Sequence, residues 1–186
     1  MNPIYLIIGP PAVGKSTTSR ALAACFPRSI HIPVDDLRNM VVSGLALPAR
    51  EWDDELTRQV TLARQAVIGM ALGYNEAGFA VIIDDFWDPN RLAEYQTLSG
   101  LPHVRRVLLL PDRIEAHRRN LLRSGDSPAR MYIDEGIRVV YDGLAGAIGE
   151  LRRQGWQIVD TSALSVAEVV ETILATTNAK SKSDGG

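Results

Sequence analysis

Residues 9–16 place two glycines, a lysine and a serine at a spacing that suits the binding of phosphate groups. They read G-P-P-A-V-G-K-S and directly follow the apolar run 4–8. In a loop of the form G-x-x-x-x-G-K-[ST] a buried strand ends and a helix begins, so free backbone N–H groups and the positive end of the helix dipole attract phosphate oxygens. Lys15 would reach the β- and γ-phosphates, and the Ser16 hydroxyl would hold Mg²⁺. The residues that we predict to bind ATP here are Gly9, Pro10, Pro11, Ala12, Val13, Gly14, Lys15, Ser16 and Thr17.

The use of lysine elsewhere in the chain sets Lys15 apart. Only three of the twenty basic residues are lysines, and the other two are Lys180 and Lys182 near the C-terminus. Arginine therefore serves wherever a general cation is enough, and a compact, mobile ammonium stands where phosphate transfer needs one. We predict that Lys15 is catalytic. The competing interpretation is an accidental loop, which the strand before the motif and the helix after it disfavour.

Two carboxylates close another apolar run. Asp84 and Asp85 follow residues 79–83, where an acidic side chain beside the phosphate loop could hold Mg²⁺ directly or through water. Successive strand residues point to opposite faces, so we expect only one of the two to face the metal, and the spacing does not say which. The alternative is that the pair caps a helix before Asp88 and Pro89.

A second acidic pair, Asp35 and Asp36, follows the apolar run 30–34. A carboxylate at this strand end could accept the proton of an attacking hydroxyl, which is nearly all the proton chemistry that phosphoryl transfer requires. We predict Asp35 as the catalytic base and Asp36 as its alternate, both in contact with the substrate. The alternative is that they cap the following helix. Arg38 shares a helical face with Asp35 and could either hold an anionic group of the substrate or remain solvated.

Arginines precede a segment that could cover the site. Arg119 and Arg123 are four residues apart and share one face of the helix predicted over 112–123. The next segment, 124–130, contains the glycine and proline of a mobile cover. Closure would bring both arginines to the transferring phosphoryl group, so we predict that they are catalytic, with Arg130 as a weaker candidate. The alternative is a solvated basic face.

Weaker signals lie at three other places. Thr161 follows the last predicted strand, where a loop could lie against the nucleotide base, although threonine is also an ordinary loop residue. Trp52 and Trp87 could line the acceptor pocket or simply pack. The acidic stretch 51–55 suits a solvated helix start.

Short apolar runs recur with helical stretches between them. The predicted strands are 4–8, 30–34, 79–83, 104–110 and 156–159, and the predicted helices are 15–26, 35–43, 52–77, 89–98, 112–123, 131–153 and 165–176. Apolar runs without polar alternation are typical of a parallel sheet covered on both faces. We therefore predict a doubly wound α/β domain over 1–176. The small and polar residues 177–186 predict a disordered tail.

Composition narrows the classes of protein that fit. The length of 186 residues suits one domain, and a net charge of −2 with an isoelectric point near 5.9 gives no basic field that would favour nucleic acid. One cysteine excludes an internal disulfide and suits a reducing cytoplasm. The longest apolar runs are far shorter than the roughly twenty residues that span a bilayer. We expect a cytoplasmic protein without a membrane partner, and the sequence is silent on oligomeric state.

With these residues in place, the chain resembles the P-loop kinases of the AAA_33 type, such as the polynucleotide 5′-hydroxyl kinase domain and chloramphenicol phosphotransferase. The resemblance rests on G-P-P-A-V-G-K-S-T at 9–17, V-D-D-L-R at 34–38, V-I-I-D-D at 81–85 and R-N-L-L-R-S-G at 119–125. It implies the three-layer sandwich of the P-loop NTPases, with strand order 2-3-1-4-5, and ATP as the phosphoryl donor. It also implies that Asp35 is the general base, and in the polynucleotide kinases the arginine that matches Arg38 holds a substrate phosphate.

The leading interpretation is an ATP- and Mg²⁺-dependent kinase that phosphorylates a hydroxyl of a small molecule, such as a metabolite, nucleoside or antibiotic. The same chemistry on a polynucleotide 5′-hydroxyl is the alternative, which the acidic residues 51–55 disfavour because they would repel a nucleic-acid backbone. A third interpretation is a regulatory ATPase without an acceptor, which would fit if Asp35 only caps a helix. A guanine-specific switch is excluded, because no lysine lies between residues 16 and 179 to form N-K-x-D.

Overall fold

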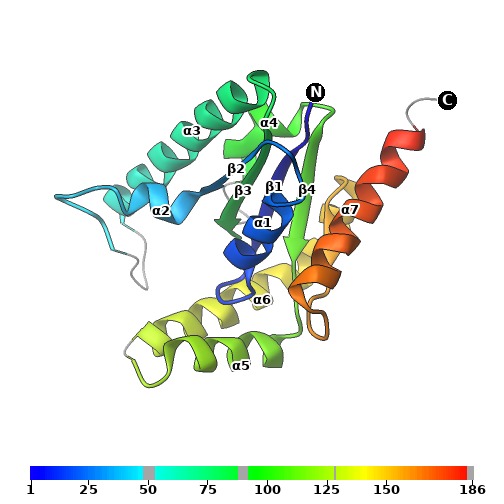
Figure 1. Cartoon of the computed structure of the whole chain (residues 1–186). Helices are drawn as coiled ribbons and strands as arrows, with labels where there is room; N and C mark the ends of the chain where they lie inside the picture. Colours follow the sequence, from blue (N-terminus) through cyan, green and yellow to red (C-terminus); the bar gives the residue numbers. More distant parts are fainter. Residues whose placement is uncertain (48–52, 88–91, 128, 184–186) are drawn as a thin grey trace.

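One parallel sheet of five strands forms the centre of the molecule (Figure 1). The computed structural model describes residues 1–47, 53–87, 92–127 and 129–183. The strands are β1 (Ile4–Gly9), β2 (Ser29–Pro33), β3 (Ala80–Phe86), β4 (Val104–Leu109) and β5 (Gln157–Val159). Their order is β2-β3-β1-β4-β5, which confirms the predicted number of strands and their order.

Helices cover both faces of the sheet and complete the three predicted layers (Figure 1). They are α1 (Lys15–Ala23), α2 (Val34–Arg38), α3 (Asp54–Glu76), the 3₁₀ turn η1 (Leu92–Tyr95), α4 (Gln96–Ser99), α5 (Arg113–Ser124), α6 (Ala129–Arg153) and α7 (Val166–Ser183). No helix within these described ranges has the length and apolar composition needed to cross a membrane.

The central strand β1 shows why the sequence has apolar runs without alternation. All of its side chains from Ile4 to Ile8 are fully buried. Ile4, Leu6 and Ile8 pack into one cluster with α3 and α4, whereas Tyr5 and Ile7 pack into the other with α1 and α7. A parallel strand between two helical layers must be apolar on both sides.

The C-terminal ends of two helices differ most from their predicted positions. α2 ends at Arg38, five residues before the predicted end at 43, because Val41, Val42 and Gly44 are poor helix formers and Gly44 adopts a φ of 77°. α7 continues to Ser183, so seven residues of the predicted tail 177–186 are helical and the last three lie outside the described residues.

Candidate active site

The predicted phosphate loop leaves β1 at Gly9 and enters α1 at Lys15. Gly14 precedes the helix with a φ of 91°, a left-handed conformation that glycine adopts at little cost. At Gly9 a Cβ atom would lie 2.5 Å from the carbonyl oxygen of Leu109, so only glycine fits between the loop and the end of β4. The two glycines thus serve two different steric requirements of one tight turn.

The Lys15 ammonium lies among the charged side chains of the candidate site, which include Asp84 and Asp35. It donates hydrogen bonds to the carbonyl oxygens of Gly9, at 3.2 Å, and Pro10, at 2.9 Å. Burial lowers the pKa of Lys15, while the carboxylates of Asp84 and Asp35 act in the opposite direction. The ends of β1, β2 and β3 therefore bring together a cation and two carboxylates that are far apart in the sequence.

Asp84 lies beside the phosphate loop. Its Oδ1 atom accepts a hydrogen bond of 3.3 Å from the Ser16 hydroxyl, and its Oδ2 atom contacts Nε2 of His31. Hydroxyl and carboxylate oxygens are the ligands that Mg²⁺ prefers, so this pair fits the ion. No group of three His, Cys, Asp or Glu side chains among the described residues could hold a metal by itself, so phosphate oxygens and water would supply the remaining ligands.

Asp85 points to the opposite face and has a different role. It is 2% exposed and accepts hydrogen bonds from Arg64 Nε at 2.6 Å, from the Tyr95 hydroxyl at 2.8 Å and from the backbone N–H of Phe86 at 2.8 Å. Arg64 is equally buried, and its Nη1 atom donates to Glu94 at 2.7 Å. Of the two candidate metal ligands, Asp85 is therefore the one turned away from the phosphate loop, because this carboxylate is held in a buried ion pair with α3.

The base predicted at Asp35 is free of the capping role that was its alternative. The residue that caps α2 is Pro33, and no side chain bonds to the open end of the helix. Asp35 and Asp36 lie in the first helical turn, both exposed, and neither accepts a side-chain hydrogen bond within the described part of the chain. Val34, the first residue of α2, is buried and fixes the direction in which the helix leaves the sheet.

Arg38 and Tyr132 lie on the same side of the site as Asp35. The Nε atom of Arg38 is buried and has no hydrogen-bond partner within the described part of the chain. Burial raises the pKa of the Tyr132 phenol, the Arg38 charge lowers it and the Asp35 charge raises it, which places this side chain of α6 near both. A lone tyrosine carries no motif, so sequence analysis did not find Tyr132.

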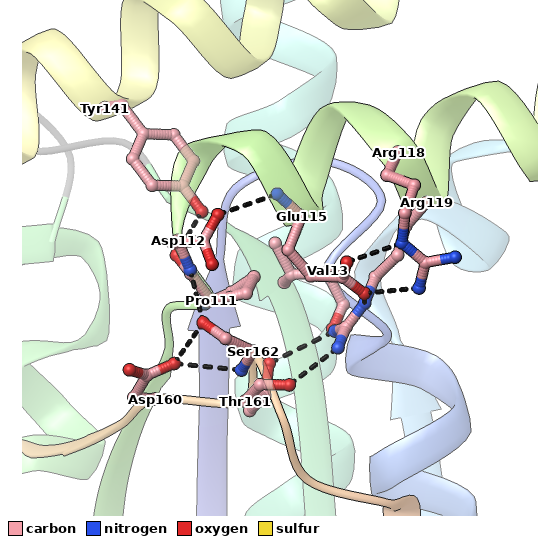
Figure 2. Close-up of polar contacts among 10 residues, drawn as sticks. All are labelled: Val13, Pro111, Asp112, Glu115, Arg118, Arg119, Tyr141, Asp160, Thr161 and Ser162. Atoms are coloured by element: carbon pink, nitrogen blue, oxygen red, sulfur yellow. Dashed lines mark hydrogen bonds and ion pairs between the residues drawn. The ribbon is translucent and has the colours of Figure 1, made fainter.

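Arg119 is held by groups on three segments, as Figure 2 shows. Its Nη1 atom donates to the carbonyl oxygen of Val13 at 3.2 Å and to the Thr161 hydroxyl at 3.1 Å. Its Nη2 atom donates to the Thr161 carbonyl oxygen at 2.6 Å, and its Nε atom donates to Glu115 at 2.7 Å. Arg119 thus ties the phosphate loop to the loop after β5, and its role at the transferring phosphoryl group stays a prediction.

A cavity of about 200 Å³ lies next to this arginine. Its lining comes from the phosphate loop, α1, α5, the loop after β5 and the start of α7, and consists of Val13, Gly14, Thr17, Thr18, Arg119, Thr161, Leu164, Val166 and Val169. The lining is mostly apolar and continuous with the phosphate loop, as a site for a nucleotide base would be. Thr161, predicted near the base, is in this lining.

Arg123, one turn further along α5, is the freer of the two predicted catalytic arginines. It is exposed, it has no ion pair or hydrogen bond within the described ranges, and its charge lowers the pKa of Lys15. α5 and α6 are joined one turn before Arg123, because buried Asn120 donates to Asp134 at 2.9 Å and to the Arg130 carbonyl oxygen at 3.1 Å. The two helices therefore form one hairpin that presents Arg123 toward Lys15.

Some of the remaining candidates make contacts within the fold. Arg130 pairs with Asp126 at 3.3 Å on the hairpin. Trp87 is buried in the core, and Trp52 lies outside the described residues. In the acidic stretch Asp53 caps α3 by accepting from the N–H of Leu56, which supports the helix-start interpretation.

Comparison with known proteins agrees with this geometry. The family model described as AAA domain, AAA_33, matches residues 4–138, which is most of the chain. The chain belongs to the AAA_33 family. The P-loop kinase resemblance seen in the sequence is thereby confirmed at the level of the family. No curated protein matches the chain.

Solved structures that are similar to this chain include several kinases. Shikimate kinase from Acinetobacter baumannii is 14% identical, with a TM-score of 0.64 over 97% of this chain and 95% of that one. The tunicamycin resistance protein of Deinococcus radiodurans is 20% identical, with a TM-score of 0.62 over 95% and 96%. A gluconokinase from Sinorhizobium meliloti 1021 is 18% identical, with a TM-score of 0.58 over 93% and 90%. At these identities the similarity concerns the fold, a P-loop kinase fold.

The opposite orientations of Asp84 and Asp85 predict opposite effects of the same substitution. Asp84→Asn should weaken Mg²⁺-dependent nucleotide binding with little loss of stability. Asp85→Asn should lower the free energy of unfolding by about 3–5 kcal/mol, because it leaves the buried Arg64 with one carboxylate fewer. Denaturant unfolding and calorimetry with a magnesium nucleotide measure both quantities. A stable Asp85→Asn protein that no longer binds the magnesium nucleotide would contradict this assignment.

Arg119→Ala should weaken ATP binding about tenfold, since charge-assisted hydrogen bonds that join the phosphate loop to Thr161 are lost. Arg118→Ala is the matched control, because Arg118 is on the same helix and pairs with the same Glu115 but is exposed. Equilibrium titration of each variant with ATP measures the effect. Unchanged ATP affinity with a lower kcat in Arg119→Ala would instead support the predicted role of Arg119 in phosphoryl transfer.

Proposed function

We propose that this protein is an ATP-dependent kinase that transfers the γ-phosphoryl group to a hydroxyl of a small-molecule acceptor. One observation carries the proposal: the Asp35 carboxylate caps no helix, and its charge acts on the Lys15 ammonium from the end of β2, which is separated from β1 by β3 alone. A regulatory ATPase would need the cation and the metal carboxylate but no free carboxylate of this kind. Shikimate kinase and gluconokinase, which share the fold, are named for small acceptors, and this supports the class of substrate.

The residues divide the reaction between them. Lys15 would exchange the carbonyl oxygens of Gly9 and Pro10 for phosphate oxygens. Ser16 and Asp84 would hold Mg²⁺, which neutralises phosphate charge when bound. Asp35 would take the proton of the acceptor hydroxyl. The oxygen of that hydroxyl would bond to the γ-phosphorus while the bond between the γ-phosphorus and the oxygen of the β-phosphate breaks, which releases ADP. Arg123 would neutralise charge on the transferring group.

A polynucleotide 5′-hydroxyl is a less suitable acceptor. Asp36 is exposed in α2, next to the proposed base. Glu55 is exposed at the start of α3, where it pairs with Arg58. A strand of nucleic acid is usually bound along a positively charged groove. Phosphorylation of 5′-hydroxyl oligonucleotides in preference to nucleosides, sugars and antibiotics would favour this alternative.

Asp35→Asn should reduce phosphoryl transfer at least about a hundredfold, because it keeps the shape of the side chain but removes the base. MgATP binding should persist. Asp36→Asn is the control, since Asp36 is the adjacent exposed carboxylate of the same helical turn. Transfer from radiolabelled ATP to the acceptor panel is the measurement. If Asp36→Asn were the variant that lost transfer, the base would be Asp36.

Lys15→Ala should also lower transfer about a hundredfold or more, because it removes a cation that acts on the transferring group. Arg20→Ala, an exposed change on the same helix, should keep transfer near that of the unmodified protein. Near-normal turnover by Lys15→Ala would refute the role of the ammonium.

A further inference from the structure

Directly after α2 the chain displays apolar side chains to solvent. Residues 39–47 contain no charged residue. Within them Met40 is 70% exposed, Val42 100% and Leu47 71%, and Val41 is exposed as well. Neighbouring apolar side chains exposed to this degree mark a place where a ligand or partner binds.

The backbone of this segment is anchored, although its side chains are exposed. Gln59 of α3 is buried, and its Nε2 atom donates to the Gly44 carbonyl oxygen at 2.7 Å. The N–H of Ala46 donates back to the Gln59 side chain at 2.9 Å. Figure 1 shows the segment running on from α2 and away from the sheet. The apolar groups are therefore presented by a fixed turn.

This display begins within one turn of the proposed base. The N–H groups of Asn39, Met40 and Val41 bond back to the carbonyl oxygens of Asp35, Leu37 and Arg38, at 2.9, 3.1 and 3.1 Å. The exposed apolar residues thus begin about one helical turn after the proposed base.

Two buried donor atoms have no hydrogen-bond partner among the described residues. They are Arg38 Nε and Trp87 Nε1. They belong to segments that follow the neighbouring strands β2 and β3. A buried donor without a partner costs free energy, which a ligand with an acceptor atom would recover.

We propose that the phosphoryl acceptor is an amphiphilic alcohol. Its hydroxyl meets Asp35, an oxygen acceptor close to that hydroxyl takes the N–H of Arg38, and its apolar body covers Met40, Val41, Val42 and Leu47. This inference rests on the proposed kinase function and names the class of its substrate.

Other occupants match these side chains less well. Single-stranded nucleic acid is bound by cations and by aromatic rings on which bases stack, and 39–47 has neither. A polyhydroxylated sugar needs many polar partners, and the segment offers only the side chains of Asn39 and Ser43. A second copy of the chain is an outcome that the experiment distinguishes.

Two matched pairs of alcohols test the inference: glucose against hexyl β-D-glucoside, and glycerol against 1-O-hexylglycerol. The members of a pair differ in one alkyl chain, whose burial should raise kcat/KM for phosphorylation at least about tenfold. The double variant Met40→Ser, Val42→Ser should lose this preference. Ile114→Ser, which changes an 83% exposed apolar residue of α5, should retain it.

Calorimetry with the same four compounds, in the presence of a nonhydrolysable ATP analogue, separates the two levels of the proposal. Binding that favours the hexyl compounds and depends on Met40 and Val42, without any transfer, would support the apolar site and contradict the kinase function. Transfer to both members of a pair at equal rates would overturn the inference and leave the kinase function standing. Absence of alkyl-dependent binding in both pairs would overturn it, as would sedimentation showing a dimer that the double variant dissociates.

Discussion

The buried ion pair between Arg64 and Asp85 determines how the end of β3 is used. Two charges removed from water must be fully hydrogen bonded to be tolerated, and here Tyr95, Glu94 and a backbone N–H complete the set. With Asp85 held toward α3, the alternation of the strand turns the preceding carboxylate toward the phosphate loop. Adjacent residues of the same type thus face opposite sides of the sheet, Asp85 toward Arg64 of α3 and Asp84 toward Ser16 of the phosphate loop.

The active site arises from the same arrangement of strands. Parallel strands bring their carboxyl ends to one edge, so the phosphate loop after β1, the aspartates after β2 and Asp84 in β3 meet although they are distant in the chain. In the proposed site, the α5–α6 hairpin would add Arg123 and Tyr132, and the anchored segment after α2 would add apolar side chains.

Much of this could be predicted where the signal is local. The phosphate loop is a contiguous motif, and the apolar runs indicated the strands, while the resemblance to a family supplied their order. The sequence could not decide between Asp84 and Asp85, because their separation depends on Arg64, which lies twenty-one residues away. Helical spacing shows that Arg119 and Arg123 share one face of α5. It does not show that Val13 and Thr161 contact Arg119. Likewise, nothing in the spacing placed His31 against Asp84, since that contact depends on the pairing of β2 with β3.

The claim that a triphosphate occupies the junction of β1 and α1 has a direct test in isothermal titration with a nonhydrolysable ATP analogue, with and without Mg²⁺. The account predicts saturable binding of one nucleotide per chain that is tighter with Mg²⁺ and whose dependence on Mg²⁺ is lost in Asp84→Asn. Failure of the purified protein to bind the nucleotide under both conditions would contradict it.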